Sequence, residues 1–352
     1  MIKEDFKMND IKQFDFDLPE HLIAQSPMKE RDHSRLLVIN KKDKTYEDKH
    51  FYDILSYLKK GDVLVRNNTK VIPARLLGIK EITHAHCELL LLHQIDGEKD
   101  NWEVMCRPAK SIKEGTIIDF GDGILKAQCI KVMDEGLRIF HFIYQGIFME
   151  ILDKLGKMPL PPYIKKQLVG NDRYQTVYAK IDGSAAAPTA GFHFTDELFD
   201  KIKALGVEVV DITLHIGLGT FRPVKVDDID KHIMHSEVYE ISEESANKLN
   251  LAKEQNRRII AIGTTSTRTL ESNFKKYHKF TPVKESTNIF IKPGYKFEAI
   301  DALITNFHLP KSTLVMLVSA FMGLDFTLDV YKHAIEKEYR FFSFGDSMFI
   351  HE

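Results

Sequence analysis

The chain has 352 residues, of which 43% are hydrophobic and 28% charged, and its net charge is −2. This composition is that of an ordinary folded protein and excludes a disordered or fibrous chain, while the length allows two domains. Because Lys and Arg show no overall excess, any contact with nucleic acid must come from local basic patches.

The three cysteines, Cys87, Cys106 and Cys129, are odd in number and lack Cys-x-x-Cys spacing. They predict neither a disulfide framework nor a cysteine zinc site, and they are typical of a reducing compartment. No signal-peptide pattern is present, and no stretch reaches about 18 consecutive apolar residues. We therefore expect a cytoplasmic protein without a membrane span. Residues 1–7 are interpreted as a short extension, with Met8 as an alternative start.

Between Gly61 and Tyr144, short runs rich in Val, Ile, Leu and Phe alternate with glycine-bearing turns. This pattern is typical of β-strands, and its regular spacing predicts a small barrel or a strongly curled sheet without a helix. The predicted strands are Asp62–Asn67, Arg75–Lys80, His86–Ile95, Trp102–Arg107, Thr116–Phe120, Ile124–Met133 and Leu137–Tyr144.

From about Thr195 onward, helical and strand patterns alternate, which predicts an α/β layer with helices packed on a sheet. Thr195 and Ser242 are expected to cap two helices that end at Gly206 and about Asn256, and Ser312 is expected to open an apolar helix. The other predicted elements are the strands Val207–Ile216, Arg258–Ile262 and Ala302–Thr305, and an amphipathic helix over Leu328–Glu338.

Four polar segments interrupt this pattern at strand ends or helix starts. Sheets of the α/β class bind ligands there, because loops and helix N-termini expose backbone N–H groups. The first segment, Gly183–Phe194, is rich in small residues that would let the backbone approach a ligand, and Phe192 or Phe194 could stack on a base. A packed loop with core phenylalanines is the alternative interpretation.

The second segment, Leu214–Pro223, contains the pair Gly217 and Gly219 directly after a predicted strand. A Gly-x-Gly pair at this position is part of a nucleotide-binding fingerprint. The match is weak, however, because Pro223 and the lack of a helical pattern beyond it do not fit that fingerprint.

In the third segment, His232, His235 and Glu237 occur within six residues, so a metal site must be considered. The spacing of the two histidines is compatible with one face of a helix, but a third ligand and an open geometry are not evident. A histidine in a loop is more often a hydrogen-bonded structural group, and we favour a role without metal.

The fourth segment pairs Gly263–Arg268 with Thr305–Thr313. Gly263 and its hydroxyl-bearing neighbours follow a predicted strand and open a helix, so their N–H groups and Arg268 could hold a carboxylate or a phosphate. This is not a Walker loop, because the Gly-Lys-Ser/Thr ending is missing. A Ser/Thr helix cap with a buried arginine is the structural alternative.

Motifs outside these segments also follow a fixed order along the chain: Phe14–Pro19, Leu22–Gln25, Ser34–Val38, Asn67–Leu76 and Tyr339–Asp346. Together with the four segments they resemble the S-adenosylmethionine:tRNA ribosyltransferase-isomerase family of queuosine biosynthesis. The resemblance covers nearly the whole chain from Met8, and so long an ordered series is highly specific. Departures are slight, with Phe192 where the family commonly has leucine and Ser347 where alanine is common.

The resemblance implies a mixed-sheet α/β catalytic domain of residues 8–68 and 152–352, interrupted by an inserted β-barrel domain of residues 69–151. It implies a tRNA-modifying enzyme that uses S-adenosylmethionine as co-substrate and needs no metal or permanently bound cofactor. The acceptor would be the 7-aminomethyl-7-deazaguanine base at the wobble position of the tRNA anticodon loop. The reaction would give epoxyqueuosine-tRNA and release adenine and methionine. We also expect a monomer.

Such a reaction needs a base for the C5′ protons that the sulfonium acidifies, an acid to protonate the departing adenine, and a neutral acceptor amine. Histidine suits these transfers because its pKa lies near neutrality. The expected catalytic residues are His193, His215, His235 and His308, with Glu237 orienting one of them. Residues expected to bind S-adenosylmethionine are Pro188, Thr189, Gly191, Phe194, Gly217, Gly219, Thr220, Phe221, Gly263, Thr264, Thr265, Arg268, Asn306 and Phe307.

Within this set, Arg268 and the Gly263 turn are expected at the methionine carboxylate, and Phe194, Phe221 and Phe307 are stacking candidates. Arg75, Arg107, Lys165 and Arg173 are expected to contact RNA. All of these assignments require Pro188–Phe194, Leu214–Phe221, Gly263–Arg268 and Asn306–Pro310 to converge on one cavity.

Two other functions remain possible at this stage. A tRNA methyltransferase would also use S-adenosylmethionine but would release S-adenosylhomocysteine. A non-catalytic RNA-binding protein would consume nothing.

Overall fold

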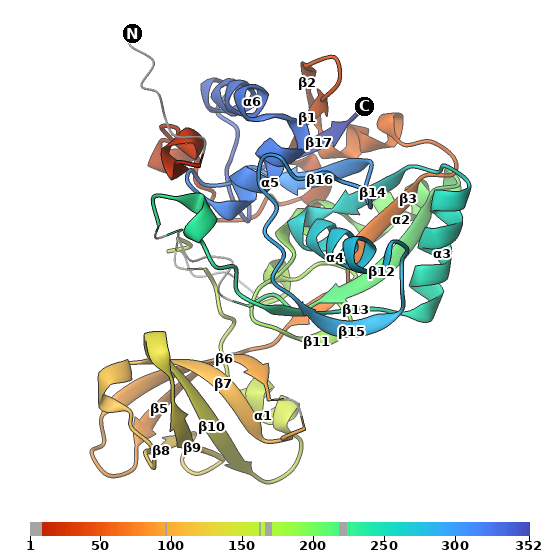
Figure 1. Ribbon diagram of the computed structural model, residues 1–352. Helices are drawn as coiled ribbons and strands as arrows, with labels where there is room; N and C mark the ends of the chain where they lie inside the picture. Colours follow the sequence, from red (N-terminus) through yellow and green to blue (C-terminus); the bar gives the residue numbers. More distant parts are fainter. Residues whose placement is uncertain (1–8, 96, 162, 166–170, 218–223, 225) are drawn as a thin grey trace.

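The computed structural model contains a large mixed sheet covered by helices and, set apart from it, a closed barrel (Figure 1). It describes residues 9–95, 97–161, 163–165, 171–217, 224 and 226–352. The predicted α/β fold with a β-barrel is confirmed.

The large sheet has the strand order β15-β13-β12-β3-β14-β16-β17-β1-β2. Its centre, from β12 to β16, is parallel. The wholly buried run Ile259–Ile262 suits a central strand that is covered on both faces. The bounds are β1 Arg35–Asn40, β2 Thr45–His50, β3 Val63–Asn67, β12 Glu208–Leu214, β13 Glu237–Ile241, β14 Ile259–Ile262, β15 Val283–Thr287, β16 Ala302–Asn306 and β17 Ser347–His351.

Helices cover both faces of this sheet. Alternate strand residues point to opposite sides, so the apolar central strands present a face to each layer of helices. Val63 and Val65 of β3 join the core under α3, α4, α5 and α6, whereas Leu64 joins a second core with α2 and a 3-10 helix, η4. The bounds are α2 Asp196–Ala204, α3 Glu243–Glu254, α4 Gly263–Tyr277, α5 Thr313–Met322, α6 Leu324–Glu336 and η4 Phe51–Tyr57.

The predicted helix caps are confirmed. The hydroxyls of Thr195, Ser242 and Ser312 each accept a hydrogen bond from the backbone N–H three residues on, at 3.1, 3.1 and 3.3 Å. The last helix, predicted over Leu328–Glu338, lies earlier in the chain, at Leu324–Glu336. It begins at Leu324, because Gly323, with φ +92°, ends α5 and starts α6 without a connecting loop.

Six antiparallel strands close the barrel in the order β10-β7-β6-β5-β8-β9. The first strand predicted for the all-β run, Asp62–Asn67, lies instead in the large sheet as β3. The three free cysteines are buried in the barrel core. The bounds are β5 Arg75–Lys80, β6 His86–Gln94, β7 Asn101–Arg107, β8 Ile117–Phe120, β9 Leu125–Val132 and β10 Leu137–Tyr144, with α1 Phe148–Leu155 packed on them.

The chain passes into and out of the barrel through neighbouring segments. The backbone groups of Arg75 and Lys157 exchange hydrogen bonds of 3.1 and 2.8 Å. Nearby, β4 (Thr69–Val71) pairs with β11 (Ile181–Ser184) in a two-stranded parallel sheet. The large sheet is therefore built from residues on both sides of the barrel in sequence, with β3 lying between β12 and β14.

Among the described residues, no single helix is both long and apolar enough to cross a membrane. Only α5 and α6 taken together have that length and composition, and they meet at a bend of 114°.

Candidate functional site

The carboxyl ends of β12, β14 and β16 open onto one cavity with about 530 Å³ of empty space, part of it open to solvent. We call it the central cavity. The four ranges required to converge, Pro188–Phe194, Leu214–Phe221, Gly263–Arg268 and Asn306–Pro310, each contribute lining residues, so that convergence is confirmed, whereas the third polar segment lies outside this cavity. Its lining residues are Ala187, Pro188, Thr189, Ala190, Ile216, Gly263, Thr264, Thr265, Thr305, Asn306, His308, Leu314, Phe342 and Ser343.

The N-terminus of α4 faces this cavity. Gly263 has φ +84°, a backbone conformation that favours glycine, and its missing side chain allows Ala190 to approach. No side chain caps the helix at Ile262, so the first-turn N–H groups beside Thr264 and Thr265 are available to a ligand. Such a helix start attracts anionic or hydrogen-bond-accepting groups.

His193 lies at the end of the 3-10 helix η8 (Thr189–His193) and is 3% exposed. Its Nδ1 is 2.6 Å from the Ser34 hydroxyl, whereas its Nε2 has no hydrogen-bond partner in the described part of the chain. Burial lowers the pKa of His193 to about 3; Asn306 opposes this shift, and the charges of Arg340 and Arg31 add to it. The ring is therefore neutral near pH 7.

His308 follows β16 and lines the central cavity. Its Nε2 is 3.0 Å from the Thr305 hydroxyl, and its backbone N–H donates to the Tyr331 hydroxyl at 3.1 Å. Burial lowers the pKa of His308 to about 3 as well. Two neutral imidazoles thus lie at this end of the sheet, and a neutral ring can accept a proton.

A second cavity of about 300 Å³, the Arg268 cavity, adjoins the central one through Leu314. Arg268 is 5% exposed, and its Nη1 donates to Glu237. The same carboxylate accepts from Gly217 N–H at 3.2 Å and lies 3.3 Å from His235 Nε2. The Arg268 Nε and Nη2 atoms are buried and lack a partner among the residues described.

A third cavity of about 290 Å³ adjoins the central one through Ser343, on the side of His193. We call it the arginine cavity. It is lined by Pro27, Met28, Arg31, Ser34, Arg173, Phe192, His193, Ser343, Phe344 and Gly345.

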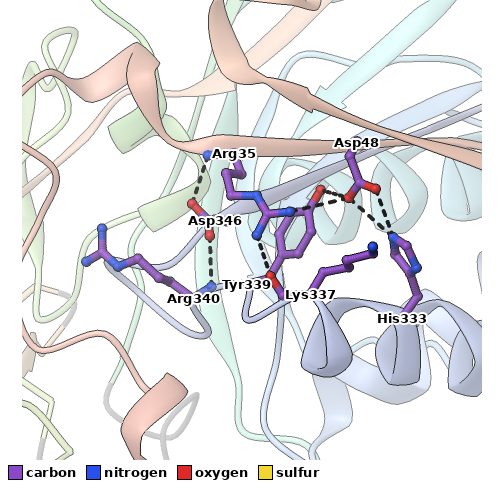
Figure 2. Close-up of polar contacts among 7 residues, drawn as sticks. All are labelled: Arg35, Asp48, His333, Lys337, Tyr339, Arg340 and Asp346. Atoms are coloured by element: carbon purple, nitrogen blue, oxygen red, sulfur yellow. Dashed lines mark hydrogen bonds and ion pairs between the residues drawn. The ribbon is translucent and has the colours of Figure 1, made fainter.

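The loop between α6 and β17 lines both the central cavity and the arginine cavity, and the Asp346 carboxylate holds it in place. Figure 2 shows Asp346 between two backbone groups, and it accepts from the N–H of Arg35 in β1 and of Arg340, both at 2.8 Å. Asn306 donates to the carbonyl of Phe342, whose φ is +75°. Sequence reasoning gave no role to Asp346 or Ser34, although both lie in the quoted motifs.

His215 occupies a different position from the other predicted histidines. Ile216 lines the central cavity. Because neighbouring side chains of an extended chain point to opposite sides, His215 faces away from it. His215 Nδ1 is 2.9 Å from the Thr69 hydroxyl, and the ring packs on Gly183, where a Cβ would come within 2.9 Å. Burial lowers the pKa of His215. The structure therefore separates His215 from the cavity that His308 lines.

The third polar segment does not form a helix. A short 3-10 helix ends at Lys231, and β13 begins at Glu237, so the predicted shared helical face of His232 and His235 is wrong. No group of three or more His, Cys, Asp or Glu side chains suited to a metal ion occurs in the described ranges.

A sequence model of the queuosine biosynthesis protein family matches residues 11–350. A relative from Staphylococcus haemolyticus (strain JCSC1435), named S-adenosylmethionine:tRNA ribosyltransferase-isomerase, is 57% identical over 340 residues, or 97% of this chain and 99% of the relative. The chain belongs to the queuosine biosynthesis protein family. Among solved structures, one described as S-adenosylmethionine tRNA ribosyltransferase from Thermotoga maritima is 36% identical with a TM-score of 0.56 and covers 96% of this chain and 99% of that one.

In this member of the queuosine biosynthesis family, two of the predicted stacking residues lie in the core. Phe194 packs on Phe51 and Phe199, and Phe307 packs on Tyr331 and its neighbours. Both phenylalanines are 0% exposed, so neither ring offers a face to a base. Phe221, Gly219 and Thr220 lie outside the described residues.

The remaining predicted residues of this family member are dispersed. Gly191 is buried in η8, where a Cβ would meet the Tyr178 hydroxyl at 2.0 Å, so its role in this structure is close packing. Arg75 and Arg107 both lie beside Glu88 of the barrel, and Arg75 pairs with it at 2.7 Å. Exposed Lys165 pairs with Glu20 at 2.8 Å. Of the four predicted RNA-contacting residues, Arg173 lines one of the three cavities.

Proposed function

We propose that this chain transfers and isomerises the ribosyl moiety of S-adenosylmethionine onto the 7-aminomethyl-7-deazaguanine base at the wobble position of tRNA. Adenine and methionine leave, and epoxyqueuosine-tRNA is the product. The observation that carries the proposal is the meeting of four distant segments at one cavity, which is flanked by two neutral histidines and a buried arginine with unpaired N–H groups.

The methionine end of the donor suits the Arg268 cavity. Ile289, Phe290 and Ile291 give it an apolar side that suits the methylene groups of the methionine chain. Arg268 Nε and Nη2, which lack a partner among the described residues, suit its carboxylate. Glu237 holds the guanidinium in place from the other side and provides a negative charge for the donor's ammonium or sulfonium group.

The adenosine part then occupies the central cavity. Pro188 and Thr189 form one wall and the start of α4 another. His193 and His308 are neutral, so either ring can take the C5′ proton that the sulfonium acidifies. The ring that has gained the proton can pass it to the departing adenine.

Product analysis tests this function. The protein is incubated with S-adenosylmethionine and tRNA that bears the aminomethyl base, and adenine, methionine and S-adenosylhomocysteine are separated by chromatography. We expect equal amounts of adenine and methionine that depend on the modified tRNA, and no S-adenosylhomocysteine.

Two controls separate the alternatives. With tRNA that lacks the aminomethyl group, no adenine should appear, because the acceptor amine is missing. S-adenosylhomocysteine would indicate a methyltransferase, and tRNA binding without any product would indicate a non-catalytic protein; either result contradicts the proposal.

A further inference from the structure

The arginine cavity has no part in the reaction as proposed so far, although it is lined by His193 and adjoins the central cavity through Ser343. Two cationic side chains line it. Arg31 comes from the 3-10 helix η3 (Arg31–His33) and Arg173 from η7 (Asn171–Tyr174), segments far apart in sequence.

Main-chain carbonyls hold both guanidinium groups in place. Arg31 donates to the carbonyls of Gln175 at 2.9 Å and Phe192 at 3.3 Å. Arg173 donates to the carbonyl of Lys29 at 3.4 Å and also to that of Met28. Main-chain carbonyls orient a guanidinium without cancelling its charge, and each group has five N–H donors. The cavity is therefore lined by two cationic groups that are already oriented.

The surroundings strengthen this field. Burial lowers the pKa of the Arg31 guanidinium, and the like charge of Arg173 adds to the shift more strongly than the Asp196 carboxylate opposes it. Arg340 contributes from the adjoining loop. Its guanidinium points away from the Asp346 carboxylate, as Figure 2 shows, and donates to the carbonyl of Ser26. An anion in the cavity would relieve the repulsion between Arg31 and Arg173.

We propose that the arginine cavity binds a backbone phosphate of the tRNA next to the modified nucleotide and thereby places the acceptor base beside His193. This inference rests on the proposed function. Arginine is suited to phosphate because its planar fork can donate two parallel hydrogen bonds.

The position of this cavity favours phosphate over the donor's carboxylate. The Arg268 cavity adjoins the central cavity through Leu314, and its buried Arg268 N–H groups, which lack a partner among the described residues, suit a carboxylate. The donor extends toward Arg268, and the arginine cavity, which adjoins through Ser343 instead, is left for the acceptor strand. The target base lies in a single-stranded loop, where phosphates are accessible beside an unstacked base.

The salt dependence of RNA binding tests the proposal. Binding of an anticodon stem-loop with the aminomethyl base is measured from low to high salt for wild type, Arg173→Gln, Arg173→Lys and Lys248→Gln. Arg173→Gln should weaken binding about tenfold and reduce the slope of log K against log salt by about 0.7, the loss of one single-strand phosphate contact. Arg173→Lys should retain the slope.

Lys248→Gln, in α3, is the matched control, because it removes one positive charge outside the three cavities. It should behave as wild type. The affinity for S-adenosylmethionine should be the same in all four proteins. An unchanged slope in Arg173→Gln, or a loss confined to S-adenosylmethionine binding, overturns the phosphate assignment.

Neutral methylphosphonate linkages locate the phosphate. The phosphates of the stem-loop are replaced one at a time by this linkage. At one position the replacement should weaken wild-type binding as much as Arg173→Gln does. At that position it should not weaken the binding of the Arg173→Gln protein any further. Equal losses in wild type and variant at every linkage would contradict the proposal. Normal adenine release with unchanged RNA binding in Arg173→Gln would refute the phosphate site alone, whereas absence of adenine release by wild type would refute the proposed function.

Discussion

Two buried arginines, one in the barrel and one at the end of the large sheet, are satisfied in different ways. Arg138 is 7% exposed, and its three guanidinium nitrogens donate to four main-chain carbonyls at 2.7–3.2 Å. Arg268 is 5% exposed, but within the described residues only its Nη1 has a partner. A buried N–H without an acceptor costs about 1–3 kcal/mol. The fold therefore explains Arg138, and a bound anion would explain Arg268.

The same difference holds for the two regions as a whole. Arg75 Nε is the one buried side-chain polar atom of the described barrel strands that lacks a partner. At the end of the large sheet, His193 Nε2, Thr265 Oγ1 and Asn306 Oδ1 lack a partner among the residues that the structure describes. Buried polar groups without partners are uncommon in native proteins, and their concentration marks a place where ligand atoms complete the structure. In the barrel the fold itself provides nearly all the partners of buried polar atoms, whereas at the end of the large sheet it does not.

Replacing the two neutral histidines, His193 and His308, should give the largest loss of activity. We expect His193→Ala and His308→Ala each to lower kcat about 10²- to 10⁴-fold, because each removes a proposed proton-transfer group, one beside the central cavity and one lining it. Single-turnover adenine release measures the effect. His141→Ala, whose ring bonds to Asn101 in the barrel at 2.7 Å, is the matched control and should retain wild-type kcat.

His215→Ala decides whether the position of His215 matters. Since its ring lies against Thr69 and Gly183, we expect a much smaller effect on kcat than at His193 or His308. A loss at His215 as large as theirs, or full activity of both cavity variants, would show that the structural assignment of the acid and base groups is wrong.

The two arginines give the next largest effect. Arg268→Gln alone removes the buried cation that donates to the Glu237 carboxylate, so the double variant Arg268→Gln/Glu237→Gln is the cleaner test. Its affinity for S-adenosylmethionine should fall about 10- to 150-fold, the effect of losing a charge-assisted hydrogen bond. Titration calorimetry measures this affinity, and thermal unfolding checks the fold.

Arg138→Gln should affect stability and not binding. It removes hydrogen bonds to main-chain carbonyls within the barrel, so it should lower the free energy of unfolding by about 1–3 kcal/mol. The affinity for S-adenosylmethionine should be unchanged. If the double variant binds S-adenosylmethionine like wild type, the distinction between the two arginines has no functional meaning.

Local features could be predicted from the sequence, and long-range ones could not. The caps at Thr195, Ser242 and Ser312 were predicted correctly because a cap depends on a hydroxyl and an N–H three residues apart. The barrel strands were visible because alternation and turns repeat within a few residues. By contrast, the hydrogen bond between Ser34 and His193 joins residues 159 apart, and nothing near either residue indicates the other.

The missed strands have physical reasons. β2 is an edge strand with the sequence Thr45–His50, in which charged residues hide any apolar alternation. The helical spacing of His232 and His235 was misleading, because only the residues before them form a short 3-10 turn. The central cavity depends on the order of strands in the sheet, which brings the carboxyl ends of β12, β14 and β16 together. In the sequence these strands are separated by α3, α4, β13 and β15, so no local pattern indicates that their ends meet.

The smallest expected effect concerns acid stability. Between about pH 3 and 6.5, a histidine is protonated in the unfolded chain but neutral when its folded pKa is about 3, as for His193 and His308. The unfolded state then binds more protons, so stability rises with pH across this window and is lost as pH falls through it. Each ring adds at most about 1.4 kcal/mol per pH unit. The four histidines of the barrel, by contrast, are all at least partly exposed.

Acid should therefore unfold the large sheet before the barrel, and the single tryptophan separates the two events. Trp102 is in the barrel core, so its fluorescence reports the barrel, whereas circular dichroism reports both regions. Because burial raises the pKa of Glu271 and Asp346 and opposes the trend, the informative quantity is the difference between wild type and His308→Asn. This variant should shift the circular-dichroism midpoint to lower pH and leave the Trp102 midpoint in place. One shared midpoint that the variant does not move would mean that the two regions respond to acid as a unit, contrary to the comparison.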